Sequence, residues 1–200
     1  MKRIILLSII SFIIFSSCSS SGYYQRELSP ENTGIDFSNG KWLLGNIDVD
    51  YEIKDKLTEM IVKDFSKHLN GRFANALNDK SLLIARQTPV NPSKSLIEEL
   101  KKGTNYDYFI NVKCTNEKSN DLHSLKGEYV DRFTVDNYYY GSKVNNAIVQ
   151  LEIYDLNRGL IIYSQKVRGS LGSGLTTSKA EKKLFIGCYK KIMKHINKAS

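Results

Sequence analysis

The stretch Ala147–Val167, AIVQLEIYDLNRGLIIYSQKV, decides the class of fold. Its two ends, Ala147–Tyr154 and Leu160–Val167, are rich in β-branched and aromatic residues, which favour strands. Between them, Asp155–Gly159 reads DLNRG, and Asp, Asn and Gly are typical of tight turns. The stretch therefore predicts two antiparallel strands joined by a short turn.

Upstream of this hairpin, strands and helices alternate. The clearest helix carries an apolar residue every four positions from Ile53 to Leu69, which lines one face of an α-helix. This helix ends at Asn70-Gly71 or continues through Phe73 and Leu77. The other elements expected here are a strand at Trp42–Val49, a short strand at Ser81–Arg86, a short helix opened by a capping box at Ser95–Glu98, and a strand at Tyr106–Thr115.

A last helix follows the hairpin, with Leu184, Cys188 and Ile192 on its apolar stripe. The element order from residue 41 is then β-α-β-α-β-β-β-α. Early alternation followed by a hairpin predicts an α/β fold that borders on α+β. We expect a mixed sheet of about five strands flanked by about three helices, in one domain over residues 41–200.

The amino terminus has the pattern of an export signal. Lys2 and Arg3 precede the apolar run Ile4–Phe15, which is shorter than the roughly 20 residues that span a membrane. Small residues follow it, as they do at a cleavage site. We therefore read residues 1–17 as a signal peptide. Residues 18–40 are rich in Ser, Asn and Gly and show no apolar period, so we expect a flexible tether there.

Phe15-Ser16-Ser17-Cys18 resembles the cleavage motif of bacterial lipoprotein signals, with Ser17 where Gly or Ala is commoner. The resemblance implies that Cys18 becomes the first residue and carries palmitate-class acyl chains. Ser19 is not acidic, which in that pattern implies outer-membrane anchoring, facing the periplasm. The alternative is an ordinary secretory signal that leaves Cys18 as a free thiol.

The partner that the positive charge of the chain suggests depends on the compartment. Lys2 and Arg3 leave with the signal, so the formal charge falls from +8 to +6. In a cytosolic protein this excess would suggest nucleic acid as a partner, whereas in the envelope anionic lipid headgroups or acidic polymers are the expected attractors. We expect no nucleic-acid partner.

Three local phrases resemble a group of bacterial envelope proteins that includes the penicillin-binding-protein activator lipoproteins, the curli-secretion lipoprotein and the amino-terminal domain of TolB. The phrases are a short strand ending at Arg86, the strand entry Asn105–Ile110, and the hairpin Leu151–Leu160, with Arg158 where Thr is usual. The resemblance spans residues 41–200. It implies this fold and a role in binding or assembling with partners.

No residue set indicates catalysis, so we expect no enzyme activity, no cofactor and no metal. Gly169–Gly174 has the glycine spacing of a phosphate loop but lacks the lysine that must follow. His68, His123 and His195 have no second ligand three or four residues away.

Cys114 and Cys188 lie on the apolar faces of their strand and helix. They either meet in a disulfide, if that helix packs on that sheet face, or remain separate buried thiols.

The segment Leu125–Lys143 is the best candidate for a partner contact. Its aromatic residues lie beside Arg132 and Lys143, and clustered Tyr with Arg is typical of contact surfaces. Charges fall on both alternation sets, which excludes a membrane-spanning strand. The alternative is a strand extension that covers the sheet edge. The candidate contact residues are Tyr129, Phe133, Tyr138, Tyr139 and Tyr140.

The sequence thus predicts a lipid-anchored envelope lipoprotein that binds an envelope protein or a cell-wall component without catalysis. The alternative is an oligomeric subunit of an outer-membrane secretion or export apparatus, which leaves homo-oligomer formation open.

Overall fold

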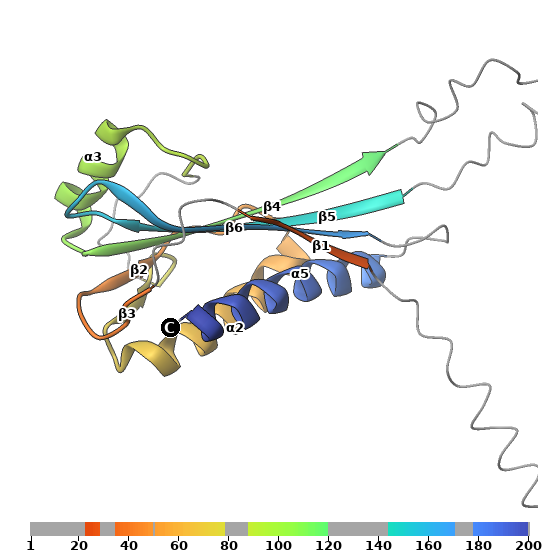
Figure 1. The fold of residues 1–200 in the computed structure, drawn as a ribbon, viewed down its shortest axis with the longest axis horizontal. Coiled ribbons are helices and arrows are strands. Elements are labelled where there is room, and N and C mark those ends of the chain that lie inside the picture. Colours follow the sequence, from red (N-terminus) through yellow and green to blue (C-terminus); the bar gives the residue numbers. More distant parts are fainter. Residues whose placement is uncertain are drawn as a thin grey trace, which may run out of the picture.

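The computed structural model describes residues 23–28, 35–49, 51–78, 88–119, 144–170 and 178–199 (Figure 1). The elements, in chain order, are β1 (Tyr23–Leu28), β2 (Trp42–Leu44), α2 (Tyr51–Leu69), β3 (Phe73–Asn75), α3 (Lys94–Thr104), β4 (Tyr108–Ser119), β5 (Val144–Asp155), β6 (Leu160–Ser170) and α5 (Ser178–Ala199).

The six strands form one mixed sheet in the order β1-β6-β5-β4-β2-β3. β2 is parallel to both of its neighbours, whereas the remaining pairs are antiparallel. The hairpin joins β5 to β6, and the Asp155 carboxylate closes its turn by accepting from the backbone N–H groups of Asn157 and Arg158 at 3.0 Å. The predicted hairpin, the mixed sheet and the element order from residue 41 are confirmed.

The helices cover the sheet on both faces (Figure 1). α2 and α5 pack on one face, where the periodic residues Leu57, Ile61 and Phe65 are fully buried. α3 lies on the opposite face and encloses a smaller core with Phe109 and Tyr154. In the part of the chain that the structure describes, no helix is both long and apolar enough to cross a membrane.

The expected tether over residues 18–40 is wrong for two of its parts. Tyr23–Leu28 pairs along its full length with β6, and it adds the sixth strand to the sheet. Ile35 and Phe37 are buried, and Arg72 donates from its guanidinium to the carbonyl oxygens of Phe37 and Gly40. The sequence does not predict β1, because the strand lies at the edge of the sheet with one neighbouring strand. Its sequence, YYQREL, is too polar to show an apolar period.

The end of α2 settles the alternative left open by the sequence. Asn70 and Gly71 have φ values of 44° and 80°, and this left-handed backbone ends the helix. Phe73 then begins β3 instead of continuing the helix. The predicted strand Ser81–Arg86 lies outside the described residues. The helix expected from Ser95 begins at Lys94, and its N-cap is Ser93.

Candidate functional site

Several of the predicted site residues lie outside the described residues: Cys18, Tyr129, Phe133, Tyr138, Tyr139 and Tyr140. The structure does place Ser119 and Val144, the described residues nearest in the chain to the tyrosine-rich segment. β4 and β5 stay in register from the Tyr108–Asp155 pair to the Ser119–Val144 pair. Ser119 and Val144 therefore lie opposite each other at the end of the β4–β5 ladder.

Cys114 and Cys188 are both free thiols in the structure. The two elements do pack together, as a disulfide would require, because Cys188 lies within 3.5 Å of the carbonyl oxygen of Ala147, on the strand next to β4. Burial raises the pKa of Cys188 to about 12, and burial together with the neighbouring Cys188 raises the pKa of Cys114. Thiols with raised pKa values are poor nucleophiles.

A buried carboxylate, Glu152, lies on the sheet face that α3 partly covers. It accepts from the Gln150 amide at 3.0 Å, from the Tyr154 hydroxyl and from the backbone N–H of Asn91 at 3.4 Å. Beside it, Asn111 donates to the carbonyl oxygens of Thr88 and Pro89. These bonds use the chain's own groups to hold residues 88–91 against the sheet, so we assign the cluster a structural role.

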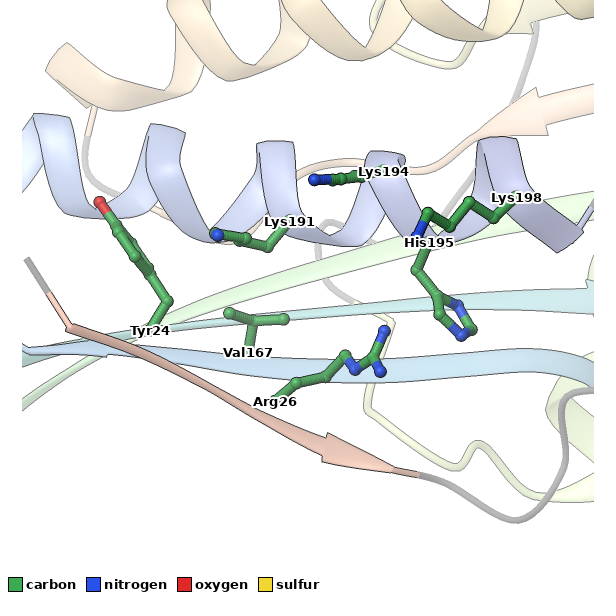
Figure 2. A pocket seen from close by; sticks show the side chains of 7 residues that line it. All are labelled: Tyr24, Arg26, Val167, Lys191, Lys194, His195 and Lys198. Carbon is green, nitrogen blue, oxygen red and sulfur yellow. The ribbon is translucent and has the colours of Figure 1, made fainter.

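A cluster of basic side chains lines a groove between α5 and β1 (Figure 2). We call it the basic groove, and its cavity measures about 190 Å³. Its lining residues are Tyr24, Arg26, Val167, Lys191, Lys194, His195 and Lys198.

Two periodicities bring these side chains together. Four of them lie on one stripe of α5, because Lys194, His195 and Lys198 follow Lys191 by three, four and seven residues. Two residues of β1, Tyr24 and Arg26, share one face of that strand because strand side chains alternate. Arg26 lies directly opposite Val167 in the β1–β6 register, so Val167 forms an apolar floor between the charged walls.

The groove is electrostatically positive. No described acidic residue forms an ion pair with Arg26 or with the three groove lysines. The ammonium group of Lys191 lies 5.8 Å from the centre of the Tyr24 ring. Burial lowers the pKa of His195, and the charges of Arg26 and Lys198 lower it further. The groove can therefore accept an anion that the protein does not itself provide.

Sequence reasoning misses this groove for an identifiable reason. The stripe of Lys191, Lys194 and Lys198 is visible in the sequence, but lysines on one helix face usually indicate only solvated surface. The observation that distinguishes the groove is the second wall, Tyr24 and Arg26, which lies within the expected tether. The described residues contain no group of three or more His, Cys, Asp or Glu side chains that could hold a metal ion.

No protein-family model matches the chain, and no curated protein matches it. Solved structures do match. The PelC dodecamer from Paraburkholderia phytofirmans matches with a TM-score of 0.39 and 10% identity over 84% of this chain and 95% of that one. Hypothetical protein CT253 from Chlamydia trachomatis matches with a TM-score of 0.42 and 10% identity over 80% and 94%.

Lipoprotein GNA1162 from Neisseria meningitidis matches with a TM-score of 0.37 and 12% identity over 78% of this chain and 99% of that one. The chain is thus similar to bacterial proteins that include a lipoprotein. At these TM-scores the likenesses carry no argument about function, and they do not bear on the specific groups that the local phrases resemble.

Proposed function

We propose that the protein is a bacterial lipoprotein, anchored through Cys18 in the outer membrane and facing the periplasm. There it acts as a non-catalytic binding or assembly module for another component of the cell envelope, either a protein or a cell-wall component. The partner contact is made by the tyrosine-rich segment between β4 and β5. The observation that carries this proposal is the continuous pairing of those two strands up to Ser119 and Val144.

That pairing gives the segment a rigid base. Ile110 and Val112 of β4 are buried in the main core, as are their partners Ile153 and Leu151 of β5. The described strands on either side of the segment are therefore anchored in the core. Contact residues that start from a rigid element lose less conformational entropy when a partner binds.

The chemistry of the described residues supports a role without catalysis. The buried Glu152 already accepts from three groups of the chain, and the two described thiols are kept protonated by burial. A catalytic acid or nucleophile needs instead a pKa matched to its reaction and room for a substrate.

Crosslinking in the native envelope, followed by mass spectrometry, tests the partner contact. We expect the triple variant Tyr138→Ser, Tyr139→Ser, Tyr140→Ser to lose the crosslinked partner while its circular dichroism is unchanged. The matched control is Leu77→Ser with Leu160→Ser, which removes two exposed apolar side chains elsewhere, 47% and 46% exposed. Equal partner yield from the triple variant and the parent chain would contradict the proposal.

The alternative, an oligomeric subunit of a secretion or export apparatus, is favoured by the position of β1. Among the described strands, β1 pairs only with β6, so its outer edge presents backbone groups that a second copy could pair with. Light scattering after size-exclusion chromatography separates the two functions. A closed assembly of many copies would support the alternative, and a monomer would support the module.

A further inference from the structure

The basic groove lies close, along the chain, to the proposed anchor. Only residues 19–22 separate Cys18 from Tyr23, the first residue of β1. An extended chain advances at most about 3.6 Å per residue, so the Cα atom of Arg26 lies within about 29 Å of that of Cys18. Because β1 is paired along its length with β6, this limit applies to the folded domain and not to a loose segment. The groove is thereby restricted to the neighbourhood of the membrane that holds the anchor.

The chemistry of the groove matches a phosphate group at a lipid surface. An arginine and several lysines are the side chains that bind phosphate oxygens most often, and here none is neutralised by a described acid. The walls are not wholly polar. The Val167 side chain forms an apolar floor beneath the charges, and the Tyr24 ring lies beside the Lys191 ammonium group, 5.8 Å from it.

We propose that the basic groove binds the phosphate of an anionic phospholipid headgroup in the membrane that carries the Cys18 anchor, and so holds the domain against that membrane. The source of the phosphate rests on the proposed lipid anchor, whereas the groove itself rests on the described side chains. Binding in this way would set the direction in which the β4–β5 end of the sheet faces.

The placement of the charges agrees with a shared ligand more than with independent surface lysines. Arg26 reaches the groove from β1 and the lysines reach it from α5, and in Figure 2 the Arg26 guanidinium extends toward the His195 ring. Nδ1 of His195 lies 3.1 Å from the Tyr163 hydroxyl, which orients the ring at the end of the groove. A phosphate between Arg26 and Lys198 would relieve the repulsion that lowers the pKa of His195.

A vesicle assay tests the proposal on the mature chain, residues 18–200, carrying Cys18→Ser. This chain contains every described residue and no acyl anchor, so only the domain can attract the membrane. We expect it to sediment with vesicles of phosphatidylcholine and phosphatidylglycerol, and not with phosphatidylcholine alone. A basic residue near an anionic surface contributes about 1 kcal/mol, so Lys191→Gln with Lys194→Gln should weaken binding about 30-fold.

The matched control is Lys94→Gln with Lys102→Gln, two exposed lysines of α3 on the opposite sheet face. It removes the same charge, and we expect it to change binding less than about threefold, since charges beyond the Debye length are screened. Equal loss in both variants would show a net-charge effect and overturn the proposal. Binding of inorganic phosphate as tight as that of the vesicles would overturn the headgroup as the source.

A second readout follows His195 by NMR. Phosphatidylglycerol vesicles should raise the pKa of its imidazole, and phosphatidylcholine vesicles should leave it unchanged. An unchanged pKa with both vesicles would overturn the proposal even if the chain sediments. The tyrosine-rich segment has no part in either measurement, so failure here is distinguishable from failure of the proposed partner contact.

Discussion

Replacing Gly187 with alanine tests whether β1 is docked on α5 as the structure places it. Gly187 lies inside α5, and a Cβ atom added there would stand 2.6 Å or less from three atoms of Tyr24, including its hydroxyl oxygen. Carbon atoms in contact are normally about 3.5–4.0 Å apart. Either Tyr24 leaves its place, or β1 and α5 separate.

The magnitude follows from two opposing effects. Alanine is favoured over glycine inside a helix by about 1 kcal/mol. Overpacking costs about 1–3 kcal/mol, and the upper value applies here because the clash involves a ring that already packs against the main core. We therefore expect Gly187→Ala to lower the free energy of unfolding by about 2 kcal/mol.

The assay is urea unfolding followed by the fluorescence of Trp42, the one tryptophan of the chain, which is fully buried. Gly103→Ala is the matched control, because a Cβ there meets no atom within 4 Å, and it should be neutral or stabilise by up to about 1 kcal/mol. In a Tyr24→Ala background, Gly187→Ala should become stabilising. If Gly187→Ala alone stabilises as Gly103→Ala does, β1 is not packed on α5.

Two further predictions concern ionisable groups. Asp107 accepts from the backbone N–H of Lys41, the Asn157 amide and the Lys101 ammonium, and the first of these bonds does most to lower its pKa from 3.8 to about 2. Its contribution to stability is fully present above pH about 4 and is lost as the pH falls through about 2. In urea titrations, Asp107→Asn should therefore cost about 1–2 kcal/mol at neutral pH, less than the full pKa shift implies because the carboxylate is partly solvated. The cost should fall well below about 1 kcal/mol at about pH 2. In the folded Cys18→Ser chain, iodoacetamide should alkylate Cys114 and Cys188 slowly, since burial raises the pKa of both thiols. Unfolding the chain without reductant should expose two reactive thiols. If no thiol reacts after unfolding, the two cysteines form a disulfide.

The sequence predicts the elements that bury an apolar stripe. The helix from Ile53 to Leu69 is recognisable because its buried face demands apolar residues at a single period. The β5–β6 hairpin is recognisable because two runs of β-branched and aromatic residues flank a set of turn residues. Asn70-Gly71 is also a local signal for the end of a helix. The structure confirms that α2 ends there and does not continue through Phe73 and Leu77.

What the sequence does not predict depends on contacts between distant segments. β1 is held by pairing with β6 and by Tyr24 against α5, and neither contact leaves a period in YYQREL. The same holds for the basic groove, where Arg26 and Lys198 meet only because β1 is part of the sheet. Whether Cys114 and Cys188 pair likewise depends on the separation of two packed elements, which residue types alone do not specify.

Intact mass spectrometry of the protein extracted from membranes tests the lipid anchor most directly. The predicted result is a chain that begins at residue 18 and carries the added mass of acyl chains on Cys18, and this mass disappears in Cys18→Ser. A chain cut at another residue, or one that begins at Cys18 with an unmodified thiol, would contradict the anchor and the membrane placement that depends on it.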